Sequence, residues 1–578
     1  MSRRILRRVF DLECLPAATA TLHPALRRVY AARGVEAAED LDLGLERLLP
    51  MSTLGGVEAA VDLLLACHRT GGKVLVVGDF DADGATSTAV VIRQLRRLGF
   101  VDPGFLVPDR FKFGYGLTPE IVRVAAQRRP ALIVTVDNGI SSIEGVEEAQ
   151  RGGIPVLITD HHLPGRPLPA AAAIVNPNAP GERFASKALA GVGVAFYVVA
   201  ALTRRMREAG LVGKAADVNA ADLLDLVALG TVADVVPLDL NNRILVAQGL
   251  RRIRAGRCAA GLRALLESAG RRLESVVAQD LGFQAGPRLN AAGRLEDMSL
   301  GIECLLTADA SEARELASRL AKLNSDRREI EFRMQQEALA KVDELVASLE
   351  GGMPAGLCLY DAGWHQGVIG LVASRIKERV HRPVIAFAPG DPGWVKGSAR
   401  SVPGVHVRDA LDAVATRNPG LLEKFGGHAM AAGMTLRAAR LAEFGQAFAD
   451  EIARRIDEDT LTGDLHTDGP LLPGEFNADT AIALREAGPW GSGFPEPSFD
   501  GRFGVAATRI VGDRHLKLRL KTASGEAVDA IAFRYLDDAR AEPVREGQDV
   551  EMVYRTELDE YGGARRMQLV SEWLRTLP

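Results

Sequence analysis

The stretch KVLVVGDFDADG, residues 73–84, decides the fold that this chain is expected to adopt. It begins as a run of apolar, mostly β-branched residues, which is typical of a buried strand, and it ends in three closely spaced aspartates, Asp79, Asp81 and Asp83. Three further apolar runs follow, at residues 105–108, 131–136 and 154–159. Because helix-length segments separate these runs, the sequence predicts an α/β fold with a parallel sheet covered on both faces.

Polar residues suited to metal binding follow three of these predicted strands. Asp137 comes directly after residues 131–136, and Asp160, His161 and His162 follow the next strand. A single D-x-D is often a turn or a helix cap, but the carboxyl ends of parallel strands share one ligand-binding edge. Crowded carboxylates repel one another unless a cation neutralises them or some of them protonate. The combination therefore predicts a site for Mg²⁺ or Mn²⁺, and two such ions form a clamp for phosphoryl displacement.

Length and composition limit the classes of protein that this chain can be. With 578 residues it is expected to hold about three or four domains. A formal charge of −5 excludes a protein that holds nucleic acid by bulk positive charge alone. The five cysteines show no C-x-x-C spacing, which favours a reducing cytoplasm. The longest uncharged stretch, residues 188–203, is shorter than the ~20 residues of a membrane helix, so we expect a buried helix there and no membrane partner.

The rest of the chain predicts further segments. We expect a turn and then a helix from about residue 86 to 98, and a proline-rich surface loop over residues 164–180. Residues 311–349 lack Pro and Gly and predict one long helix or a helical pair, and residues 516–521 alternate as in a strand of a small β-barrel. We divide the chain into an N-terminal segment 1–55, a catalytic domain 56–310, a connecting helix 311–350, a second α/β domain 351–460 and a barrel 461–578.

An ordered set of motifs identifies a family resemblance. The first four are DFDAD at 79–83, DNG at 137–139, DHH at 160–162 and GTVADVVP at 230–237. These resemble the motifs of the DHH phosphoesterases, and the resemblance continues through GPRLNAAGR at 286–294, WHQGVIG at 364–370, GSAR at 397–400 and GGHAMAAG at 426–433. The whole set is similar to the members of that family that degrade single-stranded DNA from its 5′ end. The resemblance implies a DHH catalytic domain, a DHHA1 substrate-binding domain after the long helix, and a C-terminal OB-like barrel.

The resemblance also implies roles for the acidic cluster. It implies two divalent ions, Mn²⁺ or Mg²⁺, one held by Asp81 and Asp137 and the other by Asp83, Asp137, His161 and Asp234, with Asp137 bridging. Asp79 is included as a further metal ligand. Asp160 is expected to orient its neighbours, and His162 to face the scissile phosphate, where it stabilises the phosphoryl oxygens or helps to protonate the leaving group.

Substrate contacts are expected in three places. In the second domain, the resemblance implies that Ser398 and Arg400 bind a phosphate, and the segment containing Gly426, Gly427 and His428 has the pattern of a helix start whose amides approach a phosphate. Arg288, Asn290 and Arg294 are implied to line the path of the strand.

Two further basic segments are predicted to contact nucleic acid. Arg110 and Tyr115 lie in a segment where cationic and aromatic residues alternate, and aromatic rings stack on unpaired bases. Lys517, Arg519 and Lys521 form one cationic face of the strand at 516–521, whose other face is apolar.

The resulting interpretation is a two-metal 5′→3′ exonuclease that degrades single-stranded DNA to 5′-mononucleotides in recombination and repair. A helicase and a single-strand-binding protein are the expected partners, and a monomer is expected. One alternative is a DHH phosphodiesterase that acts on short oligoribonucleotides or cyclic dinucleotides. Another is a non-catalytic single-strand-binding or scaffold protein, which would be expected to have lost metal ligands.

Overall fold

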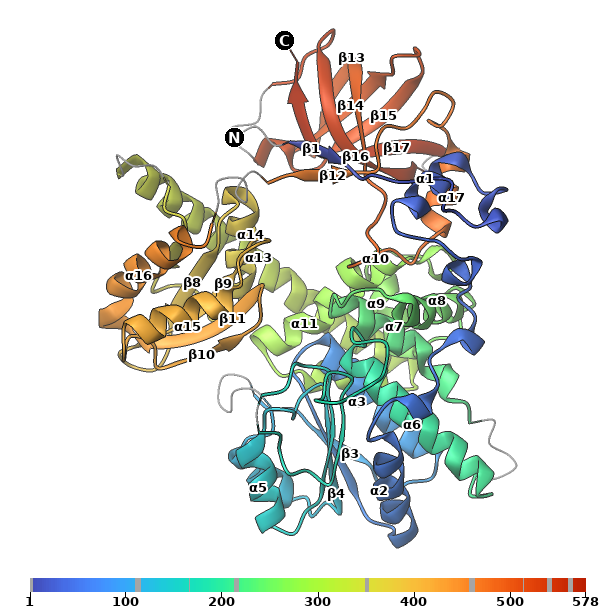
Figure 1. Cartoon of the computed structure of the whole chain (residues 1–578), viewed down its shortest axis with the longest axis vertical. Helices are drawn as coiled ribbons and strands as arrows, with labels where there is room; N and C mark the ends of the chain where they lie inside the picture. Colours follow the sequence, from blue (N-terminus) through green and yellow to red (C-terminus); the bar gives the residue numbers. More distant parts are fainter. Residues whose placement is uncertain are drawn as a thin grey trace. The chain divides into compact units, whose positions relative to one another are not determined.

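The computed structural model describes most of the chain (Figure 1). The described residues are 4–109, 116–165, 167–212, 218–348, 353–456, 463–512, 514–537, 543–559 and 565–577. The chain is divided into two compact units. The smaller unit contains residues 1–5 and 322–465, and the larger unit contains residues 6–321 and 466–578.

The larger unit contains the predicted parallel sheet. Its five strands, in the order β3-β2-β4-β5-β6, all run parallel. They are β2 (Val74–Gly78), β3 (Gly104–Leu106), β4 (Leu132–Val136), β5 (Val156–Thr159) and β6 (Ala173–Val175). The expectation of a loop over residues 164–180 was wrong for β6, which pairs with the edge of β5 and has buried Ala173 and Val175. Because the prolines of that segment lie outside these three residues, none of them blocks the pairing.

The strand order reverses beside β2, and this reversal positions the site. Strand β3 lies on one side of β2, whereas β4 lies on the other. Leu75 and Val77 of β2 pack with Ile121 and Val146, which belong to α4 (Pro119–Ala126) and α5 (Ile143–Arg151) on one face of the sheet. Right-handed crossovers then put the helix that follows β2 on the opposite face. In such sheets the crevice for ligands opens at the carboxyl ends of the two strands that flank the reversal, here β2 and β4.

The helix after β2 begins earlier than predicted. α3 spans Ala82–Arg97, so its first turn contains Asp83, whereas the sequence predicted a turn there and a helix from about residue 86. The side chain of Asp81 accepts a hydrogen bond from the Gly84 amide at 3.0 Å and thereby caps the helix. The metal-binding motif is therefore itself the start of a helix.

Further helices complete the larger unit. Besides α3, α4 and α5 they are α1 (Pro24–Ala31), α2 (Val57–Thr70), α6 (Gly191–Glu208), α7 (Leu224–Ala233), α8 (Leu240–Arg254), α9 (Ala260–Ser268), α10 (Ala278–Asp280), α11 (Gly286–Leu295), α12 (Ser299–Leu306) and α17 (Ala478–Glu486). The uncharged stretch at 188–203 forms most of α6, and its apolar side chains are buried, as predicted. Among the described residues no single helix meets the length and hydropathy of a membrane span; one bent pair, Leu45–Thr53 with Val57–Thr70, meets them jointly at an angle of 81°.

The C-terminal segment of the larger unit is a closed barrel, as predicted. Its strands follow the order β13-β14-β15-β17-β16, and only β15 and β17 pair in parallel. They are β13 (Phe499–Val511), β14 (His515–Lys521), β15 (Ala527–Ala532), β16 (Asp549–Asp559) and β17 (Arg566–Thr576). A loop before the barrel docks on α8, because the Arg243 guanidinium lies 4.2 Å from the ring centroid of Phe494, which stacks on Trp490.

The N-terminal segment packs against the C-terminal segment. β1 (Ile5–Arg7) pairs with β12 (Leu465–Thr467), and Arg33 donates to Asp468 from Nη2 to Oδ2 at 2.9 Å. The side chains of Arg33 and Asp468 are 2% and 0% exposed, and Arg33 also donates to the carbonyl oxygen of Pro495. This buried ion pair joins residues separated by 435 positions in the sequence.

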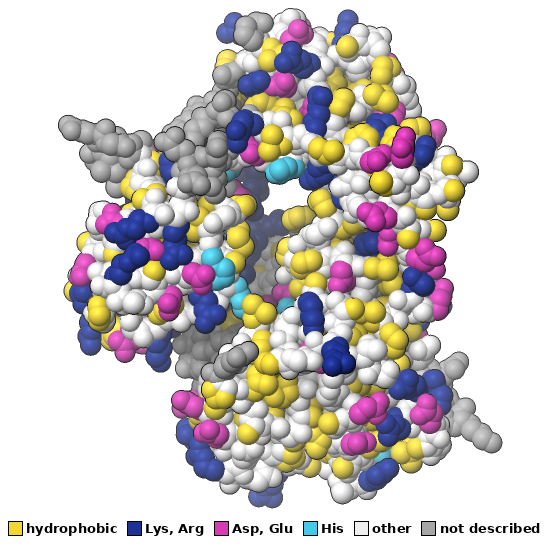
Figure 2. All heavy atoms as spheres, viewed as in Figure 1, with side chains coloured by type: hydrophobic (Ala, Val, Ile, Leu, Met, Phe, Trp, Pro, Cys, Tyr) yellow, Lys and Arg dark blue, Asp and Glu magenta, His cyan; other side chains and the backbone are white. Residues whose placement is uncertain are grey.

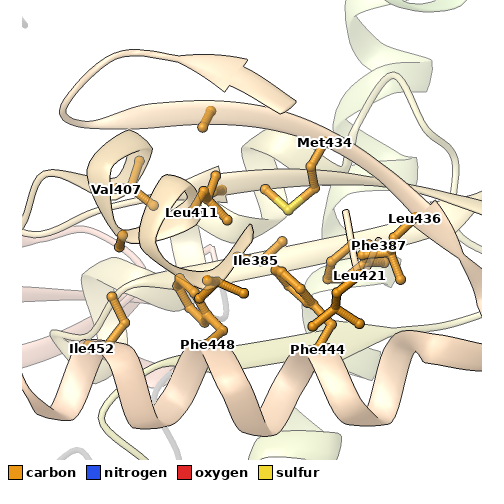
Figure 3. Packing of buried hydrophobic residues seen from close by; sticks show 14 of the residues in the cluster. Ile385, Phe387, Val407, Leu411, Leu421, Met434, Leu436, Phe444, Phe448 and Ile452 are labelled. Carbon is orange, nitrogen blue, oxygen red and sulfur yellow. The ribbon is translucent and has the colours of Figure 1, made fainter. Parts of the chain in front are cut away.

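The smaller unit is built on a second sheet, in the order β10-β11-β9-β8-β7. Its elements are β7 (Leu357–Tyr360), α14 (Ile369–Val380), β8 (Val384–Pro389), β9 (Trp394–Arg400), α15 (Val407–Arg417), β10 (Lys424–Gly427), β11 (Ala431–Arg437) and α16 (Leu441–Ala453). Figure 3 shows its core, where Phe444 and Phe448 of α16 pack beneath Ile385 and Phe387 of β8. The predicted long helix is present as α13 (Ala310–Ser348).

A β-hairpin replaces the helix start expected at residues 426–433. Gly426 and Gly427 belong to β10, which pairs antiparallel with β11, and the His428 amide donates to the carbonyl oxygen of Ala431 at 2.8 Å. The expectation was wrong because pairing with β11, itself held by β9, satisfies this backbone in a sheet.

Replacing Arg33 with Ala is expected to destabilise the larger unit by about 3–5 kcal/mol, because the buried carboxylate of Asp468 loses its closest cation. Urea unfolding of the full chain measures this change. Arg204→Ala is the control: it removes an exposed pair with Glu208 on α6 and is expected to cost less than about 1 kcal/mol. Equal losses in the two variants would contradict the role assigned to Arg33.

Candidate metal centre

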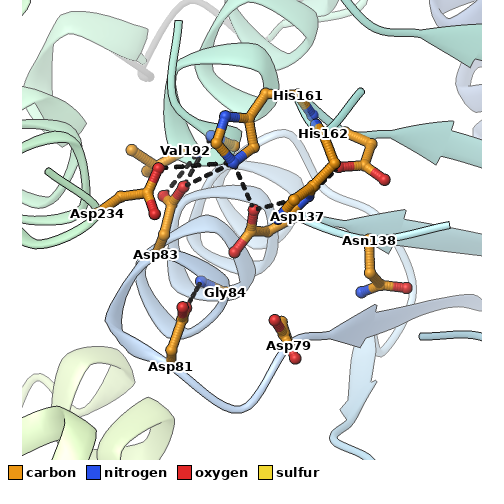
Figure 4. Close-up of polar contacts among 12 residues, drawn as sticks. Asp79, Asp81, Asp83, Gly84, Asp137, Asn138, His161, His162, Val192 and Asp234 are labelled. Atoms are coloured by element: carbon orange, nitrogen blue, oxygen red, sulfur yellow. Dashed lines mark hydrogen bonds and ion pairs between the residues drawn. The ribbon is translucent and has the colours of Figure 1, made fainter. Parts of the chain in front are cut away.

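Five acidic residues and two histidines converge at the edge where the strands end (Figure 4). Asp79, Asp81 and Asp83 follow β2, Asp137 follows β4, and His161 and His162 follow β5, whereas Asp234 lies at the end of α7. The predicted metal ligands are therefore brought together from four segments of the chain.

His161 lies at the centre of the first possible metal group. Its Nε2 atom lies 3.5 Å from Asp234 Oδ2 and 4.0 Å from Asp83 Oδ2. One ligand atom from each of these three residues falls within 4.8 Å of the others. Two carboxylate oxygens and one imidazole nitrogen form a donor set that suits Mn²⁺ and is compatible with Mg²⁺.

Asp137 connects this group with a second one. Its Oδ1 atom lies 3.2 Å from His161 Nε2. Ligand atoms of Asp79, Asp81 and Asp137 form another cluster within 4.8 Å, and Asp137, His161 and His162 form a third. Asp137 thus lies between two sets of ligands, which is the place that a bridging carboxylate requires.

The carboxylates of this cluster oppose one another's ionisation. Burial, followed by the charge of Asp81, raises the pKa of Asp234 to about 7. Burial also raises the pKa values of Asp83 and Asp137 well above the usual range, and the charges of neighbouring aspartates raise them further. A bound cation would reverse both effects by supplying positive charge where it is most needed.

Backbone amides at the start of α6 hold the carboxylate of Asp83. The Gly191 amide donates to Oδ2 at 2.7 Å and the Val192 amide to Oδ1 at 2.8 Å. A Cβ atom at Gly191 would lie 2.6 Å from Asp137 Oδ1, and one at Gly230 would lie 2.9 Å from Asp83 Oδ1. The sequence interpretation gave neither glycine a role at the site; a glycine at the start of an uncharged helix is the signal that could have indicated Gly191.

The backbone is unusual at Asp137. This residue has φ = 60°, in the left-handed region that aspartate tolerates better than most residues do. Next to it, the side-chain amide of Asn138 donates to the carbonyl oxygens of Val77 and Val136 and ties the ends of β2 and β4 together. The carboxylate of Asp137 is thus fixed on a bent, firmly anchored turn.

Asp160 orients His162 rather than joining the metal groups. Its Oδ1 atom lies 2.7 Å from His162 Nδ1, and Oδ2 accepts from the Ile140 amide at 2.9 Å. Burial works against protonation of His162, but the hydrogen bond and charge of Asp160 outweigh it and raise the pKa to about 9. Burial likewise opposes ionisation of Asp160, yet the hydrogen bond from His162 holds its pKa below the usual value.

Helix α11 supports the loop that carries the metal ligands. The side-chain oxygen of Asn290 accepts from the Ala82 amide at 2.8 Å, and a Cβ at Gly293 would lie 1.9 Å from the Phe80 carbonyl oxygen. The side chain of Arg288 is buried and donates to the Gln284 carbonyl oxygen, and Arg294 is partly buried on the same helix. Asn290 therefore has a supporting contact that the sequence did not predict.

The smaller unit gathers its predicted phosphate ligands at the start of α14. Arg400 Nη1 donates to Ser398 Oγ at 3.1 Å, and a Cβ at Gly370 would meet both side chains within 3.0 Å. Within the described part of the chain, no carboxylate lies at ion-pair distance from Arg400, and burial lowers its pKa. Such a guanidinium favours an anion beside it.

A glycine row continues from these ligands across the sheet. Ser398 of β9 lies opposite Gly433 of β11, which lies opposite Gly426 of β10. Both glycines are exposed, and open space lies where a Cβ would stand. Gly427 belongs to the same strand as Gly426, and His428 follows it with an exposed side chain. A chain of linked phosphate groups could therefore approach this surface closely.

The barrel presents the predicted alternation. Leu516, Leu518 and Leu520 of β14 are buried, whereas Arg519 and Lys521 are exposed and Lys517 is partly so. Arg519 donates to Asp529 at 2.8 Å, so the cationic face is partly neutralised. Figure 2 shows basic and acidic side chains interspersed over the face in view, consistent with the near-neutral net charge. Arg110 and Tyr115 lie outside the described residues.

Models of three families match the chain. The DHH family N-terminal domain matches residues 73–231, the DHHA1 domain matches 353–454, and the RecJ OB domain matches 467–572. The single-stranded-DNA-specific exonuclease RecJ of Dickeya dadantii (strain 3937) is 53% identical over 96% of this chain and 96% of its own length. That of Escherichia coli (strain K12) is 51% identical over 98% of this chain and 97% of its own.

Two solved structures are similar to this chain. RecJ from Thermus thermophilus in complex with Mn²⁺ matches with a TM-score of 0.80 and 31% identity, covering 100% of this chain and 80% of the other. Its complex with Mg²⁺ matches with a TM-score of 0.74 and 30% identity, covering 100% of this chain and 79% of the other. Sequence identity over nearly the full length, the order of the domains and the fold lead to one conclusion: this chain belongs to the RecJ family of DHH phosphoesterases.

Proposed function

We propose that the chain is a metal-dependent 5′→3′ exonuclease that hydrolyses single-stranded DNA to 5′-mononucleotides and acts in recombination and repair. The convergence of Asp83, Asp137, His161 and Asp234 carries this proposal, because these residues belong to groups of ligand atoms that could hold divalent ions. The names of the RecJ relatives supply the substrate class.

The residues present fit two divalent ions. Asp81 and Asp137, with Asp79 beside them, would hold one ion, and Asp83, Asp137, His161 and Asp234 would hold the other. The fit rests on the converging oxygens and on the raised pKa values, which mark a cluster that is short of positive charge. When bound, Mn²⁺ or Mg²⁺ would stabilise charge on the phosphoryl oxygens and lower the pKa of water.

His162 and Asp160 would act on the scissile phosphate. Asp160 accepts from Nδ1 and so fixes the orientation of the imidazole. The hydrogen bond and charge of Asp160 raise the pKa of His162, and a protonated imidazole at this position would stabilise the phosphoryl oxygens. The same proton could pass to the leaving oxygen as the bond breaks.

Other residues would bind the strand. Ser398 and Arg400 would hold a phosphate beside the start of α14, and Gly426, Gly427 and His428 would let the backbone of the strand pass close by. The bound DNA strand would also contact Arg288, Asn290 and Arg294 of α11. It would further contact Arg110 and Tyr115. Lys517, Arg519 and Lys521 would attract phosphates to the barrel.

The wider setting is also part of this proposal. A nuclease specific for single strands needs opened duplex, so a helicase and a single-strand-binding protein would supply and hold its substrate. The five cysteines are all free, which suits a reducing cytoplasm. The proposal includes a monomeric protein with the five segments 1–55, 56–310, 311–350, 351–460 and 461–578.

A substrate comparison tests the activity. Purified full-length protein with Mn²⁺ or Mg²⁺ is expected to release mononucleotides from the 5′ end of labelled single-stranded DNA, faster than from duplex DNA, short RNA or a cyclic dinucleotide. Asp137→Asn is expected to lower kcat at least about 10³-fold, because one carboxylate serves both metal groups. Preference for RNA or the cyclic dinucleotide, or binding without cleavage, would contradict the proposal.

His162→Ala is expected to lower kcat by about 10²–10⁴-fold, the usual contribution of a general acid, while the affinity for Mn²⁺ stays unchanged. Single-turnover cleavage and Mn²⁺ titration measure the two quantities separately. His466→Ala, which changes an exposed histidine, is the matched control. A large fall in Mn²⁺ affinity would instead make His162 a ligand in the third group of Asp137, His161 and His162.

The metal-free protein is expected to lose stability as the pH rises from about 4 to above 7. A carboxyl group whose pKa rises on folding stabilises the protein fully below its ordinary pKa near 3.9, and this contribution is lost as the pH passes the folded value, about 7 for Asp234. Urea unfolding in EDTA at pH 5 and 7.5 should therefore show a smaller pH-dependent loss in Asp234→Asn than in the wild type.

Two comparisons make this measurement specific. Mn²⁺ should stabilise the wild type at pH 7.5 more than it stabilises Asp234→Asn. Asp62→Asn, which changes an exposed carboxylate of α2, should behave as the wild type does. An identical pH dependence in the wild type and Asp234→Asn would show that folding does not raise the pKa of Asp234.

A further inference from the structure

The segment of residues 235–238 joins the metal ligand Asp234 at the end of α7 to helix α8. Its first residue, Val235, is exposed and has φ = 64°. A β-branched residue rarely adopts this left-handed conformation, and such strain persists only where the surrounding structure holds the backbone. The contacts of this segment therefore help to determine where the carboxyl group of Asp234 lies.

A buried side-chain amide fastens this segment to the chain just before α6. Asn242, in the first turn of α8, donates to the carbonyl oxygen of Pro237 at 2.9 Å. The same amide donates to the carbonyl oxygen of Ala188 at 2.8 Å. The side chain of Asn242 is fully buried, so these two hydrogen bonds form without competition from bulk water.

The two carbonyl groups belong to segments that lead to different metal ligands. Pro237 lies three residues after Asp234. Ala188 lies three residues before Gly191, whose amide donates to the carboxyl group of Asp83. Figure 4 shows the carboxyl groups of Asp83 and Asp234 next to each other, and one oxygen of each lies within 4.8 Å of the other. Asn242 thus connects the supports of two ligands of one metal group.

A second hydrogen bond runs beside this connection. Ser186 Oγ donates to Asp239 Oδ2 at 2.6 Å, and Asp239 Oδ1 accepts from the backbone amide of Asn242 at 2.9 Å. The start of α8 is therefore attached to the chain before α6 at two positions. This attachment fixes the backbone from which the Asn242 side chain extends.

The loop before the barrel holds the same segment from another direction. The amide of Leu238 donates to the carbonyl oxygen of Ser492 at 2.6 Å. Gly493 has φ = 72°, and a Cβ atom there would lie 3.1 Å from Pro237 Cβ. Residues 237 and 238 are thus held between Asn242 and this loop, and all of these residues belong to the larger unit.

We propose that Asn242 is a positioning residue of the metal centre. Through its two carbonyl partners it sets the separation between Asp83 and Asp234. Among the described residues, Asn242 belongs to none of the groups that could hold a metal ion, so it acts through the backbone. Two carboxylates that share an ion must stay close although they repel each other, and a connection between their supporting segments opposes that repulsion. The inference rests on the proposed metal centre.

Calorimetric titration of the metal-free, full-length protein with Mn²⁺ tests the proposal. Asn242→Leu removes both hydrogen bonds at similar volume and is expected to weaken Mn²⁺ binding by about 10–100-fold, the usual effect of losing a group that supports metal ligands. Gln94→Leu is the matched control. Gln94 is also fully buried and donates to Thr203 of α6 at 2.7 Å, but it lies about 16 Å along α3 from Asp83. The control is expected to lower the melting temperature while the affinity for Mn²⁺ stays unchanged.

A double-mutant cycle with Asp234→Asn separates positioning from a general loss of stability. Because Asn242 acts through the same metal group, the loss of Mn²⁺ affinity in Asn242→Leu with Asp234→Asn should be smaller than the sum of the two single losses. Two independent sites would give additive losses.

A glycine variant tests the same segment if Asn242→Leu does not fold. Gly493→Ala should displace Pro237 and weaken Mn²⁺ binding. Gly525→Ala is its control, since Gly525 also has a positive φ, 85°, but has open space where a Cβ would stand. This control should bind Mn²⁺ as the wild type does.

Three results would overturn the inference alone. They are equal Mn²⁺ affinities in Asn242→Leu and Gln94→Leu, equal affinities in Gly493→Ala and Gly525→Ala, and additive losses in the double-mutant cycle. Absence of Mn²⁺ binding in the wild type would overturn the metal centre and this inference together. A failure of the inference can therefore be distinguished from a failure of the proposed function.

Discussion

The hydrogen bonds from the start of α6 to the Asp83 carboxylate are the contacts on which the metal centre depends. They hold the buried carboxyl group of Asp83 against two backbone amides, so the backbone of α6 fixes its position. Around that point Asp81, Asp137 and Asp234 lie close together, and the charges of Asp81 and Asp234 raise the cost of ionising Asp83 and Asp137. The fold therefore holds in place a cluster of carboxylates whose repulsion is relieved by a bound cation or by protonation.

The sheet and its polar edge could be predicted because they depend on local composition. Residues 74–78, 132–136 and 156–159 are continuous apolar runs, and the aspartates directly follow them. The start of α3, strand β6 and the hairpin at residues 424–437 depend on other parts of the chain. Asn290 accepts from the first amide of α3, β5 provides the pairing edge for β6, and β9 holds β11. No local pattern contains that information.

The candidate site shows the same limit. The types of its side chains were evident from the motifs, because carboxylates and imidazoles are uncommon at the ends of buried strands. The parts contributed by backbone were not evident. Gly191 lies 108 positions from Asp83, and its role is to provide an amide and to leave room for Asp137. Gly191 acts because it has no side chain, so a prediction based on side-chain chemistry does not identify it.

The pairing of the first residues of the chain with its last third has a consequence for synthesis. Arg33 is made early, yet its partner Asp468 and the loop that contains Pro495 emerge from the ribosome only after more than four hundred further residues. Until then the segment that contains Arg33 has no buried carboxylate to pair with. The parallel sheet can form while the chain is still growing, whereas the segment that contains Arg33 is completed only after residue 468 has been made.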